Sequence, residues 1–281
     1  MESLISERLS TLGHPKRLAV FRLLMRRYPD RVAATELAQS LDLKSNTLST
    51  YVKALLQSGL LTQERAGTSL RYAINMDAAR HTFDYLLRDC CRGRPEICSM
   101  TYMTDLNGVR AMPDAKYNVL FICTGNAARS IFAESILREE AGDRFNAYSA
   151  GTKPTSTLNP FAVEVLEQKG HDIAPLRSKN ITEFRTGDAP DFDFVFTVCN
   201  HAANEECPAW QGQPVSAHWG MPDPVKVEGT DAEKNLAFHH AYGALRNRIM
   251  AFAALPFDTL DRISLQRAVD EIGQVASAEP A

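Results

Sequence analysis

The sequence contains no apolar run long enough to span a membrane, and its first residues lack the basic and apolar pattern of a signal peptide. It also lacks a large net charge, with 31 basic and 34 acidic residues among 281. These absences exclude a membrane-spanning protein and predict a cytoplasmic one with no membrane partner. In the cytoplasm structural disulfides are unusual, so cysteine is expected to serve chemistry or metal binding instead.

Cysteine is scarce, and its few copies are grouped. The six are Cys90, Cys91 and Cys98, then Cys123, then Cys199 and Cys207. In a reducing compartment, cysteines grouped in this way indicate reactive or metal-binding thiols more than structural disulfides.

The chain is long enough for two domains, each with its own core. The first hundred residues carry 15 basic and 10 acidic side chains, whereas the remainder is acidic. A basic domain joined to an acidic one is typical of a nucleic-acid-binding module fused to another domain. We predict a first domain at 1–98, a linker at 99–116 and a second domain at 117–281. The linker shows no helical or strand periodicity and contains the turn-forming residues Asn107-Gly108 and Pro113.

The first domain reads as short helices followed by a hairpin. A helix at 33–41 and a turn precede a second helix, which Ser45 caps and Gly59 ends. One face of this second helix is apolar. Its other face is polar and suits base edges and phosphates in a major groove. The predicted DNA-binding residues, on this helix and on the hairpin at 60–74, are Ser45, Asn46, Thr47, Ser49, Thr50, Lys53, Arg65 and Arg71.

Taken alone, such a polar face is more often a solvated surface, but the order of the elements predicts a mainly α winged helix-turn-helix. Residues 12–24, 36–41 and 46–61, with the hairpin, resemble the ArsR/SmtB family of metal-responsive repressors. The resemblance implies a homodimer formed through this domain. It also implies binding to an inverted-repeat operator in DNA and release by a soft metal or metalloid.

The helix-turn-helix lacks the cysteine that several arsenic sensors of that family carry there. The available thiols are Cys90, Cys91 and Cys98, after the hairpin. Three soft thiolates suit As(III) or Sb(III), and some arsenite-responsive relatives are similar in this respect. The alternative is three incidental thiols at a helix end facing a dimer partner.

The second domain is organised around residues 123–130, which lie between an apolar strand pattern at 117–122 and a helical pattern at 131–137. Loop N–H groups and a helix start form a cradle for an anion. The same field is expected to depress the pKa of the Cys123 thiol, and Arg129 can clamp an oxyanion. The predicted oxyanion-binding residues are Thr124, Gly125, Asn126, Ala127, Ala128 and Arg129.

Strand and helix patterns alternate from this loop onward, which predicts a three-layer α/β domain with a parallel sheet. Cys199 follows a second buried strand pattern, so it is expected at the same edge of the sheet as Cys123. Asp223 lies in a stiff, proline-flanked loop that suits a general acid.

Residues 117–273 resemble the low-molecular-weight protein tyrosine phosphatase superfamily, and most closely its arsenate reductase branch. The matching stretches are 119–130, 148–152, 197–208 and 218–224. The resemblance implies that the Cys123 thiolate attacks arsenate while Asp223 protonates the departing oxygen. Ser130 is placed to donate a hydrogen bond to that thiolate.

The same resemblance implies that Cys199 attacks Cys123 and that Cys207 resolves the product as a Cys199–Cys207 disulfide. No tightly bound cofactor is expected. The electron donor is thioredoxin or glutaredoxin with glutathione, and the spacing of the two cysteines leaves that choice open. Ala128 replaces a second loop cysteine found in many relatives, so Cys123 is the only nucleophile of the loop.

Two other functions remain open for the second domain. A phosphatase needs only Cys123, Arg129 and Asp223. It would leave Cys199 and Cys207 unused, and it expects aromatic residues after the acid, where this chain has Val225-Lys226. An oxyanion-sensing regulator without turnover needs no general acid or second thiol. We therefore expect a bifunctional arsenic-resistance protein, whose product As(III) is the effector of its own repressor domain.

Overall fold

The computed structural model describes residues 2–92, 116–205, 210 and 212–274. Contacts divide the chain into two compact units, Met1–Asn107 and Gly108–Ala281. Apart from Lys116, the predicted linker lies outside the described residues, so its boundaries stay a prediction. No helix in the described part of the chain is long and apolar enough to cross a membrane.

The first unit is a winged helix-turn-helix, as the sequence predicted. Its helices are α1 (Glu2–Leu12), α2 (Pro15–Arg26), α3 (Ala34–Ser40), α4 (Ser45–Gln57) and α5 (Met76–Tyr85), followed by a π-helical turn, η1 (Leu86–Cys90). Its strands are β1 (Val32–Ala33), β2 (Leu61–Ala66) and β3 (Ser69–Ile74), which form an antiparallel sheet in the order β1-β3-β2. The sequence had predicted the β2–β3 hairpin but not β1.

Helix α4 is held by its apolar face. Leu48, Val52 and Leu55 repeat at helical spacing and are buried in the core of this unit. The predicted cap was wrong by one residue: Lys44 occupies the N-cap position without a side-chain hydrogen bond, and Ser45 is the first helical residue. The helix ends as expected before Gly59, whose φ of +73° suits glycine.

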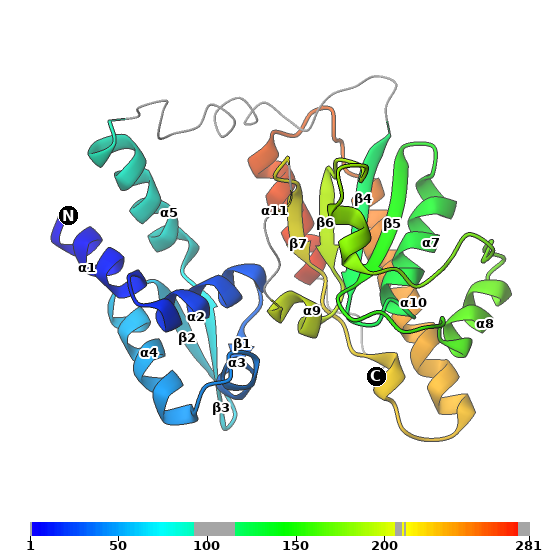
Figure 1. The fold of residues 1–281 in the computed structure, drawn as a ribbon, viewed down its shortest axis with the longest axis horizontal. Coiled ribbons are helices and arrows are strands. Elements are labelled where there is room, and N and C mark those ends of the chain that lie inside the picture. Colours follow the sequence, from blue (N-terminus) through cyan, green and yellow to red (C-terminus); the bar gives the residue numbers. More distant parts are fainter. Residues whose placement is uncertain (1, 93–115, 206–209, 211, 275–281) are drawn as a thin grey trace. The chain divides into compact units, whose positions relative to one another are not determined.

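The second unit is built on a parallel sheet of β4 (Tyr117–Cys123), β5 (Phe145–Gly151), β6 (Phe194–Thr197) and β7 (Val215–His218), in the order β5-β4-β6-β7. Its helices are α7 (Arg129–Ala141), α8 (Pro160–Gln168), α9 (Asn200–Asn204), α10 (Asp231–Ala253) and α11 (Arg262–Gln274), with short 3-10 turns at η3 (Ile181–Arg185) and η4 (Pro224–Lys226). Figure 1 shows these helices packed around the sheet. The predicted α/β class with a parallel sheet is confirmed.

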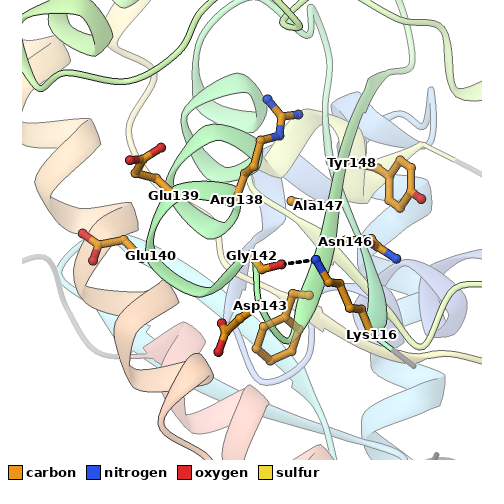
Figure 2. A pocket seen from close by; sticks show the side chains of 10 residues that line it. Lys116, Arg138, Glu139, Glu140, Gly142, Asp143, Asn146, Ala147 and Tyr148 are labelled. Carbon is orange, nitrogen blue, oxygen red and sulfur yellow. Dashed lines mark hydrogen bonds between the residues drawn. The ribbon is translucent and has the colours of Figure 1, made fainter. Parts of the chain in front are cut away.

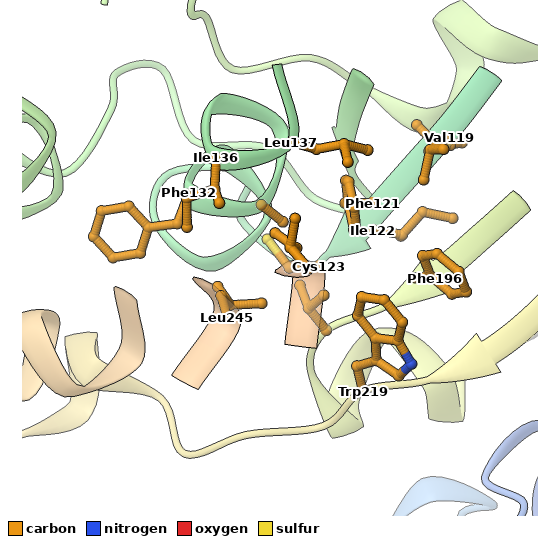
Figure 3. Close-up of a cluster of buried hydrophobic side chains, with 14 of the residues drawn as sticks. Val119, Phe121, Ile122, Cys123, Phe132, Ile136, Leu137, Phe196, Trp219 and Leu245 are labelled. Atoms are coloured by element: carbon orange, nitrogen blue, oxygen red, sulfur yellow. The ribbon is translucent and has the colours of Figure 1, made fainter. Parts of the chain in front are cut away.

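The core of this unit is rich in aromatic side chains. Trp219 is completely buried and stacks on Phe196 with ring centroids 4.0 Å apart, while its indole N–H donates to the Val269 carbonyl. Phe252 meets both rings edge-on. Figure 3 shows Cys123 among the buried side chains of this cluster, so the predicted nucleophile lies where the central strand leaves the core.

Asp270 is a partly buried carboxyl on α11, and burial raises its pKa to about 6 from 3.8. The native state therefore holds this proton more tightly than the unfolded chain does. The protonated Asp270 carboxyl therefore contributes to the free energy of unfolding below about pH 4, and this contribution is lost as the pH rises through about 6. We expect Asp270→Asn to stabilise the second unit by about 1 kcal/mol above pH 6, discounted for partial exposure.

This prediction is checked by urea unfolding at pH 5 and pH 8. Both tryptophans lie in the second unit, so their fluorescence reports its unfolding. The exposed Glu228, which does not act on the Asp270 carboxyl, is changed to Gln as the control. A gain at pH 8 no larger than that of the control would contradict the assignment.

Candidate active site

Residues 124–128 form a loop between β4 and α7, and four carbonyl groups at this turn point outward to the segment that follows β5. The carbonyls of Cys123, Thr124, Gly125 and Ala127 accept hydrogen bonds from the N–H groups of Thr152, Lys153, Thr155 and Asn159, at 2.9–3.1 Å. Because a trans peptide holds its N–H opposite its carbonyl, the loop N–H groups face inward. Such a concave ring at a helix start binds a tetrahedral anion.

Gly151, at the end of β5, lets the chain pack closely against this loop. A Cβ atom at this position would lie 2.6 Å from the Thr124 carbonyl oxygen and 3.0 Å from Asn126 Cβ. Any other residue would push the loop away from the segment that holds its carbonyls.

Cys123 lies at the start of the loop and is 3% exposed. Its sulfur is 2.9 Å from Ser130 Oγ and accepts a hydrogen bond from the Asn126 N–H at 3.2 Å. Contrary to the sequence-based expectation, the pKa of this thiol is raised. Burial is the main cause and the Cys199 thiol adds to it, while Ser130 and Arg129 lower the pKa. The sequence pattern showed the stabilising groups but not the depth of burial that outweighs them.

Asn126 fixes the shape of the loop. Its φ is +46°, a left-handed conformation that asparagine tolerates, and its side chain is completely buried. The side-chain amide donates to Ser130 Oγ and Ser149 Oγ, each at 2.8 Å, and accepts from the Lys179 N–H at 2.6 Å. The hydroxyl next to the Cys123 sulfur is thereby held in place.

A buried ion pair lies behind this asparagine. Glu134 on α7 accepts from Ser149 Oγ at 2.5 Å and pairs with the Lys179 ammonium group at 2.8 Å. Glu134 and Lys179 are 4% and 6% exposed, and an unpaired charge at that depth is costly. The sequence analysis did not include this pair. A carboxylate inside an apolar helical run was the available signal, because it requires a buried partner.

Arg129, the first residue of α7, reaches across to the Asp223 loop. Its guanidinium is 2.7 Å from the Asp223 carboxylate and donates to the Met221 carbonyl at 3.3 Å. Arg129 is 9% exposed, so this contact lies at the edge of the core and not in open solvent. The expected anion clamp and the expected general acid are therefore neighbours.

Cys199 lies beside the loop, as its place at the end of β6 predicted. Its sulfur is 3.4 Å from Thr124 Oγ1 and is 3.4 Å from the Ala202 N–H, which donates to it at the start of α9. Cys199 is 2% exposed. Two buried thiols thus occupy the carboxyl ends of two adjacent strands. Cys207 lies outside the described residues.

In the first unit, the predicted DNA-binding residues lie on α4 and on the hairpin. All are exposed except Thr47, which is half-buried. The hairpin register pairs Arg71 with Glu64 and Arg65 with Leu70, so the two arginines project from opposite faces. The sequence did not distinguish these faces.

The predicted metalloid site is only partly described. Cys90 is exposed and Cys91 half-buried at the end of the π-helical turn, where the Cys91 N–H donates to the Leu86 carbonyl at 2.9 Å. Cys98 lies outside the described residues. Among the residues that the structure does describe, no three His, Cys, Asp or Glu side chains are placed to hold a metal ion.

A separate pocket of about 620 Å³ lies at the other end of α7. It is lined by Arg138, Asp143 and Tyr148, among others, and Lys116 donates there to the Gly142 carbonyl at 2.5 Å (Figure 2). Helix α7 has 13 residues, so about 20 Å separates its two ends. Of the predicted catalytic residues that the structure describes, none lines this pocket.

Comparisons with known proteins identify both units. The model of the low molecular weight phosphotyrosine protein phosphatase family matches residues 118–264, and a helix-turn-helix domain model matches residues 12–64. An arsenate reductase of Halalkalibacterium halodurans is 38% identical over 135 residues, which are 48% of this chain and 94% of that protein.

Two further similarities are of the same kind. An arsenate reductase of Bacillus subtilis is 36% identical over 48% of this chain and 94% of its own length. The solved structure of an arsenate reductase in the phosphate binding state is 25% identical over 49% of this chain and 97% of that one, with a TM-score of 0.39. Because the phosphatase model matches more than half of the chain and both relatives are covered over 94% of their length, the chain belongs to the low molecular weight phosphotyrosine protein phosphatase family, in its arsenate reductase branch, and it carries a helix-turn-helix domain ahead of the phosphatase-like one.

Proposed function

We propose that the second unit reduces arsenate to arsenite through a relay of cysteine thiols. The observation that carries this proposal is the second buried thiol, Cys199, next to the loop that begins at Cys123. Hydrolysis of a phosphate ester needs a nucleophile, a clamp and an acid, but no second thiol. A two-electron reduction needs two thiols that become a disulfide.

In the first step, arsenate docks on the inward N–H groups and on Arg129. The Arg129–Asp223 pair opens as the anion takes the guanidinium. The Cys123 thiolate forms a bond to arsenic while the bond from arsenic to one arsenate hydroxyl breaks, and that hydroxyl leaves as water with a proton from Asp223. Ser130 and Asn126 hold the sulfur in line during this attack.

In the second step, the Cys199 thiolate attacks the Cys123 sulfur and a disulfide forms. The electron pair of the sulfur–arsenic bond passes to arsenic, which leaves as arsenite. Cys207 then attacks Cys199, forms the Cys199–Cys207 disulfide and frees the Cys123 thiolate. An external dithiol, thioredoxin or glutaredoxin with glutathione, reduces that disulfide.

The test of this proposal is arsenate-dependent oxidation of NADPH, coupled separately through a thioredoxin and a glutaredoxin system. Turnover with either system supports the proposal and identifies the donor. Hydrolysis of a chromogenic aryl phosphate without any arsenate reduction would favour a phosphatase instead.

For the first unit we propose an arsenite-responsive repressor that binds an inverted-repeat operator as a homodimer. Helix α4 would enter the major groove with its exposed polar face. Three apolar side chains of this unit are exposed, Leu4 on α1, Phe83 on α5 and Leu87 on η1, and their burial against a second copy would favour the dimer. Their exposed fractions are 40%, 47% and 42%.

Cys90→Ser is expected to keep the repressor on its operator when arsenite is added. The thiol is exposed and adjacent to Cys91, and removing it breaks a trigonal thiolate site built with Cys98. Operator binding is measured by gel shift against arsenite concentration, and we expect the half-release concentration to rise at least about ten-fold.

The matched control for this variant is Cys199→Ser, which removes a buried thiol from the other unit. It is expected to release the operator as the wild type does. Equal release of the Cys90→Ser variant and the wild type would rule out Cys90 as an arsenite ligand.

A further inference from the structure

His218 ends β7 and is 2% exposed, and both of its ring nitrogens have hydrogen-bonding partners. Nδ1 is 2.8 Å from Thr197 Oγ1, and Nε2 is 3.2 Å from Asn200 Oδ1. Thr197 lies two residues before Cys199, and Asn200 directly follows it. The imidazole ring therefore bridges the chain on the two sides of that thiol.

The residues packed around the His218 ring leave it little room to adopt another orientation. A Cβ atom at Gly220 would lie 2.4 Å from His218 Nε2 and 2.5 Å from Asn200 Oδ1, so only glycine allows this contact. The backbone N–H of Trp219 also donates a hydrogen bond to the Thr197 carbonyl at 2.8 Å. A buried ring nitrogen left without its partner is energetically costly, which favours keeping both hydrogen bonds.

Helix α9 needs such an attachment because it is short. It has five residues, Asn200–Asn204, and a helix of that length is not stable by its own hydrogen bonds. Cys199 is its N-cap residue, so the position of the sulfur depends on where α9 begins. Asn200, the first residue of the helix, is the one that His218 contacts.

We propose that His218 is a positioning residue for Cys199, holding its sulfur beside the loop for attack on Cys123. This inference rests on the proposed arsenate reduction, in which Cys199 is the second thiol. Attack of one sulfur on another requires a near-contact geometry, and a displacement of about 1 Å can slow such a step about a hundred-fold. The Thr197 and Asn200 contacts limit that displacement.

The test compares His218→Leu with His171→Leu. His171 is the matched control because it is also buried, with Nδ1 3.0 Å from Ser135 Oγ and Nε2 2.7 Å from the Tyr242 hydroxyl, far along the chain from Cys199. Two quantities are measured. One is steady-state arsenate reduction, and the other is the rate of alkylation of Cys199 and Cys123 by iodoacetamide, followed by peptide mass spectrometry.

For His218→Leu we expect kcat to fall about ten- to a hundred-fold without a rise in the KM for arsenate, because the anion site is intact. Alkylation of Cys199 should accelerate about ten-fold, while that of Cys123 stays within about two-fold of the wild type. His171→Leu should change none of these. His218→Gln, which keeps a hydrogen-bonding side chain, should lie between wild type and His218→Leu and serves if the leucine variant does not fold.

An unchanged alkylation rate at Cys199 in His218→Leu or His218→Gln would overturn the proposal, as would the same change in His171→Leu. A higher KM for arsenate with unchanged Cys199 alkylation would assign His218 to the anion loop instead. If the wild type reduces no arsenate, the proposed function fails. The alkylation rates then still decide whether His218 holds Cys199 in place.

Discussion

Cys199→Ser is expected to lower arsenate reduction by at least about a thousand-fold, because serine cannot form a disulfide with Cys123. The oxygen of serine can keep the contact with Thr124 Oγ1 and the bond from the Ala202 N–H, which lie 3.4 Å from the Cys199 sulfur. The change therefore removes the redox chemistry and little else. Arsenate-dependent NADPH oxidation with the donor that supports the wild type is the measurement.

The control for this variant is the aryl phosphatase reaction. Any hydrolysis of a chromogenic aryl phosphate depends on Cys123, Arg129 and Asp223, so Cys199→Ser should leave it within about two-fold of the wild type. Arsenate reduction that survives the substitution would show that the electrons reach arsenic by another route, and the thiol relay would then be wrong.

The sequence predicted the two folds because their signals are local. The alternation of strands and helices, the helix-turn-helix order and the strand-loop-helix at Cys123 each lie within a few tens of residues. The parallel register follows from those elements, and it brings Cys123 and Cys199 to the same edge of the sheet. A pattern along the chain was sufficient for these predictions.

The rest depends on contacts between residues that are distant in sequence. Burial of Cys123 outweighs Ser130 and Arg129 and raises the thiol pKa, and no local pattern gives that depth. The Glu134–Lys179 pair joins residues 45 positions apart, and the His218–Asn200 contact joins residues 18 apart. Sequence reasoning can flag a charged residue in an apolar helix as needing a partner, but the fold decides which partner it finds.

Arg129→Lys is expected to lower kcat/KM for arsenate about a hundred- to a thousand-fold, although the charge is kept. The guanidinium contacts the Asp223 carboxylate at 2.7 Å and the Met221 carbonyl at 3.3 Å through two different nitrogens. A single ammonium group cannot make the same two-point contact with an oxyanion. The lysine keeps the positive charge beside Cys123. A fall in kcat/KM would therefore measure the effect of the guanidinium geometry separately from that of its charge.

The matched control is Arg246→Lys, since Arg246 pairs with Glu140 at 2.7 Å on the surface, where any cation serves. It should change kcat/KM by less than about two-fold. Inhibition by inorganic phosphate should weaken in Arg129→Lys in parallel with the loss of arsenate turnover, because both anions bind the same Arg129 guanidinium. If the lysine variant keeps wild-type kcat/KM while phosphate still competes fully, the loop N–H groups bind the anion without the Arg129 fork, and the docking step must be assigned to them alone.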